Sequence, residues 1–274
     1  MTIIRETLAK LKKTSEQDPA DFEMDVVQTR NVSADNDKIG WGSPTYNKSR
    51  SVQLVPDIIE NNRCVGFFHD APEVEYYRLL RTQILQRANE KGGNTIMVTS
   101  ALPGEGKTLT AINLAFTFAK EFKQTALLVD CDLRQQKIHE YLGLKSDKGL
   151  VDYLMDDKPV QDLIIWPGIE KFTLISGGSA TAGSSELLGS PRMKELVEDM
   201  KSRYPERFVI FDVPPLLSTA DALAFAPFVD HILVVVRAGR TSIRDVNKAL
   251  RLLPREKVLG LALNGQNVVP RTYP

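Results

Sequence analysis

The sequence predicts an α/β fold in which a mostly parallel, twisted sheet carries helices on both faces. Six apolar runs support this prediction, and they are continuous rather than alternating, as expected of strands buried on both sides. They lie at 95–98, 126–130, 172–176, 207–212, 231–236 and 258–263. Segments with helical spacing lie between several of these runs, at 109–119, 190–204, 219–226 and 241–253. Strands that alternate with helices are typical of a parallel sheet covered on both faces.

A glycine-rich turn joins the first apolar run to the first helical segment. It reads ALPGEGKT and departs from the pattern GxxxxGK[ST] only at Ala101, where the first glycine is usual. Backbone N–H groups of such a turn, together with the helix N-terminus, bind phosphate. Lys107 would contact the β- and γ-phosphates, and Thr108 would place its hydroxyl on Mg²⁺. The candidate nucleotide-binding residues are Pro103, Gly104, Glu105, Gly106, Lys107, Thr108 and Leu109. The turn predicts a P-loop NTPase fold, and a chance glycine-rich turn is the less favoured alternative.

Carboxylates stand at the ends of two further apolar runs. Asp130 and Asp132 close the second run, while Asp212 closes the fourth and precedes two prolines. Because the carboxyl ends of parallel strands face the ligand crevice, we expect all three carboxylates near the bound phosphates. They suit Mg²⁺, directly or through water, and one of them could accept a proton. Solvated acids at strand ends are the alternative, and the neighbouring phosphate-binding turn makes it less favoured.

Composition limits the possible partners and compartments. Lys and Arg number 35 and so do Asp and Glu, so the net charge gives no electrostatic case for nucleic acid or an acidic membrane. The two cysteines, Cys64 and Cys131, make no disulfide framework and fit a reducing cytoplasm. We find no apolar run near the roughly 20 residues that span a bilayer, and no signal-peptide core. The expected location is cytoplasmic, or peripheral at the inner membrane face through a membrane partner.

The N-terminal part differs from the rest of the chain. Residues 1–13 carry Ile4, Leu8 and Leu11 at helical spacing, which predicts an amphipathic helix. This helix could bind a membrane surface or a partner, or it could be a weakly packed terminal helix. Residues 14–51 are polar and predict a flexible linker. Residues 52–274 are expected to form the P-loop domain, with 52–68 packed against it as a strap.

A charged pattern lies in the helix predicted at 73–85. Glu75, Arg78 and Arg81 are three residues apart, so they share one side of that helix. Taken alone, this pattern is typical of a solvated charged face.

The three site motifs together resemble the Walker A, A′ and B motifs of bacterial tyrosine kinases, the ATPase-fold partners of polysaccharide chain-length regulators. The motifs lie at 100–108, 129–134 and 211–215, and the accessory stretches at 185–193, 236–241 and 263–264 also resemble that family. Glu75, Arg78 and Arg81 match its ExxRxxR oligomerisation motif. The N-terminal helix and linker are similar to the exosortase-associated subgroup of the same family.

This resemblance implies an ATP-dependent protein-tyrosine autokinase that regulates polysaccharide synthesis and export. The implied cofactors are ATP and Mg²⁺, and the implied catalytic residues are Lys107, Asp130, Asp132 and Asp212. Asp130 would accept the tyrosine proton, while Asp132 and Asp212 would lie in the metal shell together with Thr108. The implied partners are further copies of the chain in a ring and the cytoplasmic segment of a membrane chain-length regulator.

Three further residues receive roles through the same resemblance. Arg134 would contact phosphate and Asn264 would contact adenine. Tyr273 is the candidate phosphoacceptor, although family tails are usually rich in tyrosine and this tail holds a single one. The alternative, that Tyr273 is an ordinary residue of the tail, is favoured equally.

Other functions stay open beside kinase activity. Partition and division-site ATPases share the fold, but their signature lysine would fall at Leu102, so the kinase form of the loop is favoured. An ATP-hydrolysing switch of polysaccharide assembly without tyrosine phosphorylation is an alternative that the poor tail supports. The other alternative is a structural ring, in which ATP only controls the assembly of subunits through the surface of Glu75, Arg78 and Arg81.

Overall fold

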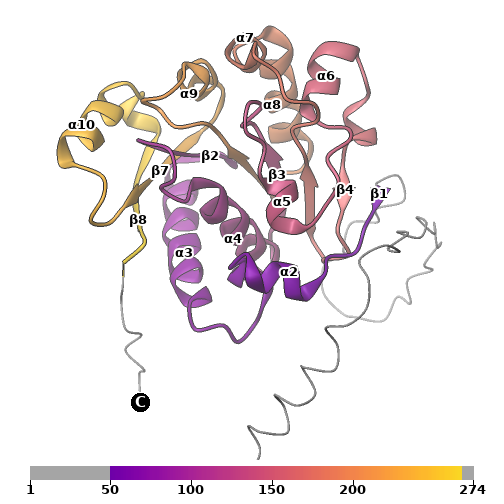
Figure 1. The fold of residues 1–274 in the computed structure, drawn as a ribbon, viewed down its shortest axis with the longest axis horizontal. Coiled ribbons are helices and arrows are strands. Elements are labelled where there is room, and N and C mark those ends of the chain that lie inside the picture. The colour runs from indigo at the N-terminus through magenta and orange to yellow at the C-terminus, as the bar shows by residue number, and fades with distance from the viewer. Residues whose placement is uncertain (1–49, 267–274) are drawn as a thin grey trace, which may run out of the picture. The chain divides into compact units, whose positions relative to one another are not determined.

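The computed structural model describes residues 50–266, so the predictions for the N-terminal helix, most of the linker and Tyr273 lie outside the described residues. Within this range the chain builds one eight-stranded sheet with the order β1-β4-β5-β3-β6-β2-β7-β8 (Figure 1). The strands are β1 Arg50–Ser51, β2 Thr95–Ser100, β3 Thr125–Asp130, β4 Ile165–Trp166, β5 Phe172–Ile175, β6 Arg207–Asp212, β7 His231–Arg237 and β8 Val258–Asn264. The six predicted strands are therefore confirmed.

The strands pair in parallel, apart from the antiparallel contact between β4 and β5. Strand β2 lies between β6 and β7, and β3 lies on the other side of β6. The three strands that carry the site motifs are consequently neighbours. The very short strands β1 and β4 were not expected, because two residues are too few to form a recognisable apolar run.

Helices cover both faces of the sheet. One face packs against α2 Pro56–Asn61, α3 Val74–Lys91, α4 Lys107–Ala119 and α5 Ile138–Leu142, through one buried apolar cluster. The other face packs against α6 Leu150–Asp156, α7 Ser184–Leu188, α8 Pro191–Arg203, α9 Asp221–Phe225 and α10 Ile243–Arg251, through a second cluster. Single turns of 3-10 helix are η1 Val65–Phe67, η2 Val160–Asp162, η3 Ala226–Phe228 and η4 Arg255–Lys257. The three-layer α/β prediction is confirmed.

Helix α4 occupies the centre of one face, and almost all of its side chains are buried. A helix that is buried on every side must be covered all round, and here the sheet, α3 and η1 cover it. The strap predicted at 52–68 supplies part of this cover, since Ile59 and Cys64 are fully buried in the same cluster. Helix α3 extends six residues beyond the predicted end and stops at Lys91, before Gly92 with φ 76°.

No helix among residues 50–266 is long and apolar enough to cross a membrane.

Candidate active site

The phosphate-binding turn leaves β2 after Ser100 and enters α4 at Lys107. Gly104 and Gly106 have φ values of 76° and 94°, which residues with a side chain rarely adopt. A Cβ atom at position 106 would also overlap the Asn264 side chain. Both glycines are therefore required by the shape of the turn, as the sequence predicted.

The first turn of α4 brings Lys107 and Thr108 against the predicted carboxylates. Lys107 Nζ lies 2.8 Å from Asp132 Oδ2 and 3.3 Å from Asp212 Oδ1. The Thr108 hydroxyl donates a 2.6 Å hydrogen bond to Asp212 Oδ2. One lysine, one hydroxyl and two carboxylates thus meet at the carboxyl ends of adjacent strands, where the sequence placed them.

Strand register brings the third carboxylate to the same place. Asp130 at the end of β3 is the direct neighbour of Asp212 at the end of β6. Asp130 is fully buried, and its two oxygens accept hydrogen bonds from the backbone N–H groups of Asp132 (3.1 Å) and Ile138 (3.2 Å). Asp130 therefore holds the backbone that presents Asp132, which is itself slightly exposed.

The charges in this cluster do not balance, because three carboxylates face one ammonium group. Burial and the nearby Asp212 raise the pKa of Asp130 to about 8. Burial also raises the pKa of Asp212, although Lys107 and Thr108 act in the opposite direction. Burial disfavours the charged form of Lys107, but Asp212 and Asp132 prevail and raise the pKa of this lysine above its ordinary value. Lys107 is consequently charged, and the cluster favours additional positive charge.

The donor set fits Mg²⁺ in a nucleotide complex. The Thr108 hydroxyl and the carboxylates of Asp132 and Asp212 are hard oxygen ligands, the kind that Mg²⁺ prefers. The described residues contain no cage of three or more His, Cys, Asp or Glu side chains for a metal ion. Few protein ligands are expected where substrate phosphates supply the others.

Glu105 contributes its side chain to the shape of the turn. It is only 1% exposed, and its Oε2 accepts a 2.7 Å hydrogen bond from the backbone N–H of Leu102. Its Oε1 accepts from the Thr241 hydroxyl and from the Arg237 backbone N–H. Sequence reasoning did not single out Thr241 or Arg237 as site residues, although both lie in the accessory stretch 236–241 that marked the family resemblance.

Two carbonyl groups of the turn also accept hydrogen bonds from side chains of the β7 and β8 ends. Arg237 Nη1 donates to the Gly104 carbonyl at 3.0 Å, and Asn264 Nδ2 donates to the Glu105 carbonyl at 2.8 Å. In this structure the Asn264 amide supports the turn, and its expected contact with adenine stays a prediction.

The remaining predicted contacts lie around this centre. The Arg134 guanidinium donates to the Ser184 hydroxyl at 2.7 Å and lies 3.5 Å from the buried carboxylate of Asp221. Arg134 is therefore held by α7 and α9 through its Nε, and its expected contact with phosphate stays a prediction. Pro103 is exposed and Leu109 is half-buried at the start of α4.

The side chains of the ExxRxxR residues already make contacts within the domain. Glu75 and Arg78 form a 3.1 Å ion pair, and Arg78 also donates to the His69 carbonyl. Arg81 donates to the Thr117 carbonyl at 2.8 Å and pairs with Glu121 at 3.1 Å, so its charge is used within the domain. The interpretation as a simple solvated face therefore fits Glu75 but not Arg81.

Comparison with known proteins identifies the family. Residues 93–257 match the family described as an AAA domain. The chain is 34% identical over 196 residues to the tyrosine-protein kinase YwqD of Bacillus subtilis, covering 71% of this chain and 81% of that protein. It is 33% identical over 229 residues to the succinoglycan biosynthesis transport protein ExoP of Rhizobium meliloti, covering 78% of this chain but only 28% of ExoP.

A solved structure supports the same relationship. The kinase domain of the Escherichia coli tyrosine kinase ETK matches with a TM-score of 0.69 and 27% identity, covering 85% of this chain and 95% of that domain. The match to YwqD extends over most of both proteins, and the AAA domain matches more than half of the chain. Taken with the Lys107 centre, these likenesses show that the chain belongs to the bacterial tyrosine kinases of exopolysaccharide biosynthesis.

Proposed function

We propose that this chain transfers the γ-phosphoryl group of ATP to a tyrosine hydroxyl and thereby regulates exopolysaccharide synthesis and export. The observation that carries the proposal is the meeting of Lys107 and Thr108 with Asp132 and Asp212 at the carboxyl ends of adjacent strands. Phosphoryl transfer depends mainly on positioning and charge neutralisation, and this centre supplies both.

Each residue of the centre has a proposed role. Lys107 and the backbone N–H groups of the turn bind the β- and γ-phosphates and neutralise the charge that develops on them. Thr108, Asp132 and Asp212 hold Mg²⁺, which supplies further neutralisation of the phosphate oxygens when it is bound. An acceptor hydroxyl must then approach in line with the γ-phosphate, on the open side of the turn.

Asp130 is the proposed proton acceptor. A tyrosine hydroxyl has an ordinary pKa of about 10, so a carboxylate must help to remove its proton late in the transfer. Burial beside Asp212 raises the pKa of Asp130 to about 8. Mg²⁺ bound beside it would favour the ionised form of Asp130, which is the form that accepts a proton.

The proposed partners follow from the family. We infer a homo-oligomer in which one copy phosphorylates the next, with Tyr273 as the acceptor. We also infer a membrane polysaccharide chain-length regulator whose cytoplasmic segment recruits the protein to the inner membrane face. The relative ExoP is named as a transport protein for succinoglycan biosynthesis, which supports an assignment to polysaccharide export.

The test is phosphotyrosine formation on the purified full chain with MgATP, mapped by mass spectrometry. Lys107→Met should abolish the signal because the β- and γ-phosphates lose their main cationic contact, while the fold is retained. The matched control is Lys145→Met, at an exposed lysine away from the turn, which should keep wild-type signal. Phosphotyrosine that persists in Lys107→Met would contradict the proposal.

A second candidate is an ATP-hydrolysing switch of polysaccharide assembly without tyrosine transfer, because the centre of Lys107, Thr108, Asp132 and Asp212 also suits hydrolysis of ATP. This candidate predicts ATP consumption without phosphotyrosine, even when the cytoplasmic segment of the membrane partner is added. Tyr273→Phe separates the two candidates further, since only the autokinase loses its phosphosite in that variant.

A further inference from the structure

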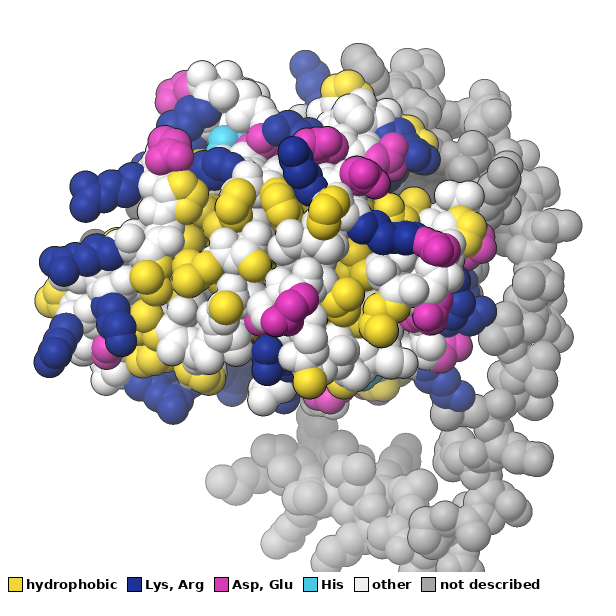
Figure 2. Space-filling view, turned by 90° about the horizontal axis from the view of Figure 1, so that it is seen from above, with side chains coloured by type: hydrophobic (Ala, Val, Ile, Leu, Met, Phe, Trp, Pro, Cys, Tyr) yellow, Lys and Arg dark blue, Asp and Glu magenta, His cyan; other side chains and the backbone are white. Residues whose placement is uncertain are grey.

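The side of α10 that faces away from the sheet carries positive charge. Arg244, Lys248 and Arg251 are spaced four and three residues apart, so they share this side of the helix. Arg255 in η4 continues the series, and we call these four residues the basic surface. All four are exposed, and none of them forms an ion pair within residues 50–266. Figure 2 shows Lys and Arg side chains gathered on the left, where α10 lies in Figure 1.

The cations of the basic surface are not balanced by carboxylates of the same helix. On α8, by contrast, the exposed Arg203 pairs with Asp199 at 2.7 Å. The single carboxylate of α10, that of Asp245, accepts a hydrogen bond from the Ser242 hydroxyl at the start of the helix. Residues 237–257 hold seven Lys or Arg against two Asp or Glu, so this part of the chain is strongly positive although the whole chain is neutral.

Two exposed apolar side chains border the basic surface. Ile243, the first residue of α10, is 81% exposed, the highest value for a large apolar side chain in the described part of the chain. Leu252, which follows the helix, is 44% exposed. Cations beside exposed apolar side chains are typical of a surface that lies on an anionic membrane, where apolar groups enter the interface and cations meet lipid phosphates. The charged backbone of a nucleic acid offers no such apolar contact.

We propose that the basic surface binds the anionic phospholipids of the inner membrane face. The cytoplasmic leaflet carries a negative surface potential that attracts clusters of Lys and Arg. The net charge of the chain gives no case for this contact, but the local charge does, because attraction to a surface acts within about 8 Å at physiological salt. The contact would act beside the proposed recruitment by a membrane protein, and it does not depend on tyrosine transfer.

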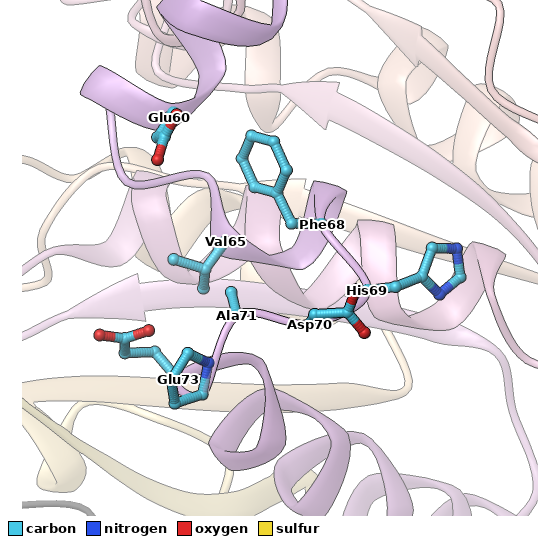
Figure 3. Close-up of a pocket in the computed structure, with 8 residues that line it drawn as sticks. Glu60, Val65, Phe68, His69, Asp70, Ala71 and Glu73 are labelled. Carbon is cyan, nitrogen blue, oxygen red and sulfur yellow. The ribbon is translucent and has the colours of Figure 1, made fainter.

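The carboxylates that would oppose this contact lie near the other end of α3. Figure 3 shows Glu60, Asp70 and Glu73 around a cavity of about 440 Å³ close to the start of that helix. Lys91, the last residue of α3, donates a hydrogen bond to the carbonyl of Glu256 in η4. The 18 residues of α3 separate its two ends by about 27 Å, roughly three Debye lengths. A membrane at the basic surface is therefore screened from these carboxylates.

The proposed contact is weak enough to be reversible. Each Lys or Arg near an anionic membrane strengthens binding about fivefold, so the four cations together contribute a factor of roughly 600. Stable attachment to a membrane generally takes two signals. The basic surface supplies one of them and orients the domain on the membrane, while the proposed membrane protein supplies the other.

Binding of the purified full chain to vesicles tests the inference. The vesicles contain phosphatidylglycerol and phosphatidylcholine in equal parts, or phosphatidylcholine alone, and cosedimentation measures the partition coefficient. The neutralised variant carries Arg244→Gln, Lys248→Gln and Arg251→Gln. Glutamine has a high helix propensity, so α10 should still form. Arg240 is left unchanged, because its Nη1 lies beside Gly104 of the phosphate-binding turn.

The matched control removes three positive charges elsewhere on the domain. It carries Lys123→Gln, Lys145→Gln and Lys194→Gln, at exposed positions before β3, after α5 and on α8. Both variants have the same net charge, so a difference between them depends on where the charges lie. Thermal unfolding followed by circular dichroism checks that both variants fold.

Wild type and control should bind the anionic vesicles much more tightly than phosphatidylcholine alone. The neutralised variant should bind the anionic vesicles about 100-fold more weakly, because three cations are lost. Salt at about 1 M should weaken wild-type binding to a similar degree, since the Debye length is then ~3 Å. Ile243→Ser should weaken binding roughly tenfold through the loss of an apolar contact. Met155→Ser, at an exposed methionine of α6, should leave binding unchanged.

Three outcomes would overturn the inference without touching the proposed tyrosine transfer, because phosphotyrosine is assayed without membranes. Equal binding by the neutralised variant and wild type would assign the membrane contact to another segment, such as residues 1–13. Equal losses in the neutralised and control variants would mean that only net charge matters. A wild type that ignores anionic vesicles would refute the contact outright. If that protein binds a labelled DNA duplex and the neutralised variant does not, the basic surface is a nucleic-acid site.

Discussion

At the scale of single residues, the phosphate-binding turn depends on a carboxylate that faces away from the phosphates. A negative side chain within an anion-binding turn would oppose binding if it were directed at the ligand. Glu105 avoids this because its carboxylate is buried between Leu102 and the turn at 237–241. The carbonyl groups of Gly104 and Glu105 are held on the same side, which leaves backbone N–H groups for the phosphates.

Thr241→Val removes the hydroxyl that donates to Glu105 and should weaken nucleotide binding. A hydrogen bond to a buried charged group contributes about 1.5–3 kcal/mol, which corresponds to a roughly 10- to 150-fold rise in the dissociation constant for ATP. Thr241→Ser retains the hydroxyl and should bind nearly as well as wild type. Titration with a fluorescent ATP analogue measures both variants, and equal affinities for Val and Ser would argue against this role.

The raised pKa of Asp130 predicts a pH-dependent stability in the nucleotide-free protein. The folded state keeps a proton on Asp130 up to about pH 8, whereas the unfolded chain loses it near pH 4. Stability from this group therefore falls as the pH rises through that window. Asp130→Asn removes the titration, so the variant should gain stability relative to wild type between pH 5 and pH 8.

Urea unfolding at the two pH values, with chelator and without nucleotide, measures this gain. Asp147→Asn is the matched control, because a hydrogen bond from Arg50 lowers the pKa of Asp147 and moves its titration below pH 4. The stability difference between that variant and wild type should be the same at pH 5 and pH 8. A flat difference for Asp130→Asn as well would show that Asp130 is ionised in the folded protein.

At the scale of elements, α4 is fixed by a contact with η1 that involves a glycine. The backbone N–H of Gly66 donates a 2.7 Å hydrogen bond to Asn113 Oδ1, and Asn113 Nδ2 donates to the Arg63 carbonyl. A Cβ atom at position 66 would lie 2.6 Å from the Asn113 carbonyl oxygen and 3.0 Å from Phe116 Cβ. The strap and the helix can therefore approach this closely only with glycine.

Gly66→Ala should destabilise the fold by about 1–3 kcal/mol, the usual cost of forcing an extra carbon into a packed interior. Gly183→Ala is the matched control, because its only neighbour within 4 Å is the flexible end of Glu186, at 3.9 Å. This control should change stability by less than about 1 kcal/mol. Chemical denaturation measures both variants, and a neutral Gly66→Ala would mean that the strap shifts at little cost.

At the scale of the whole molecule, the parallel pairing of strands brings the residues of the candidate active site together. Folding also places acidic and basic side chains on different parts of the surface. Strands β2, β3 and β6 end side by side, so that Asp130, Asp132 and Asp212 all lie close to Lys107. Asp212 is more than 100 residues away from Lys107 in the sequence. The net charge of zero hides local differences, since residues 55–75 hold five Asp or Glu against one Arg, whereas residues 237–257 hold seven Lys or Arg against two Asp or Glu. The net charge of the chain therefore says little about which partners it binds, because binding depends on how the charged side chains are distributed over the surface.

The fold class, the principal strands and the Lys107 centre are predictable from the amino-acid sequence. These features rest on local signals: continuous apolar runs, a glycine-rich turn between strand and helix, and carboxylates at strand ends. The short helices α5, α6 and α7 were not predicted, because segments of five to seven residues carry less than two turns of helical periodicity.

The partners of the individual side chains, by contrast, follow from tertiary packing. It directs the Glu105 carboxylate and the Asn264 amide toward the support of the turn, and it pairs Arg134 with Ser184 and Asp221. It also shows that Arg81 is used within the domain while the cations of α10 are free of ion pairs in the described part of the chain. The physical reason is that side-chain partners come from segments distant in the sequence, and only the packing of those segments determines which charges and donors meet.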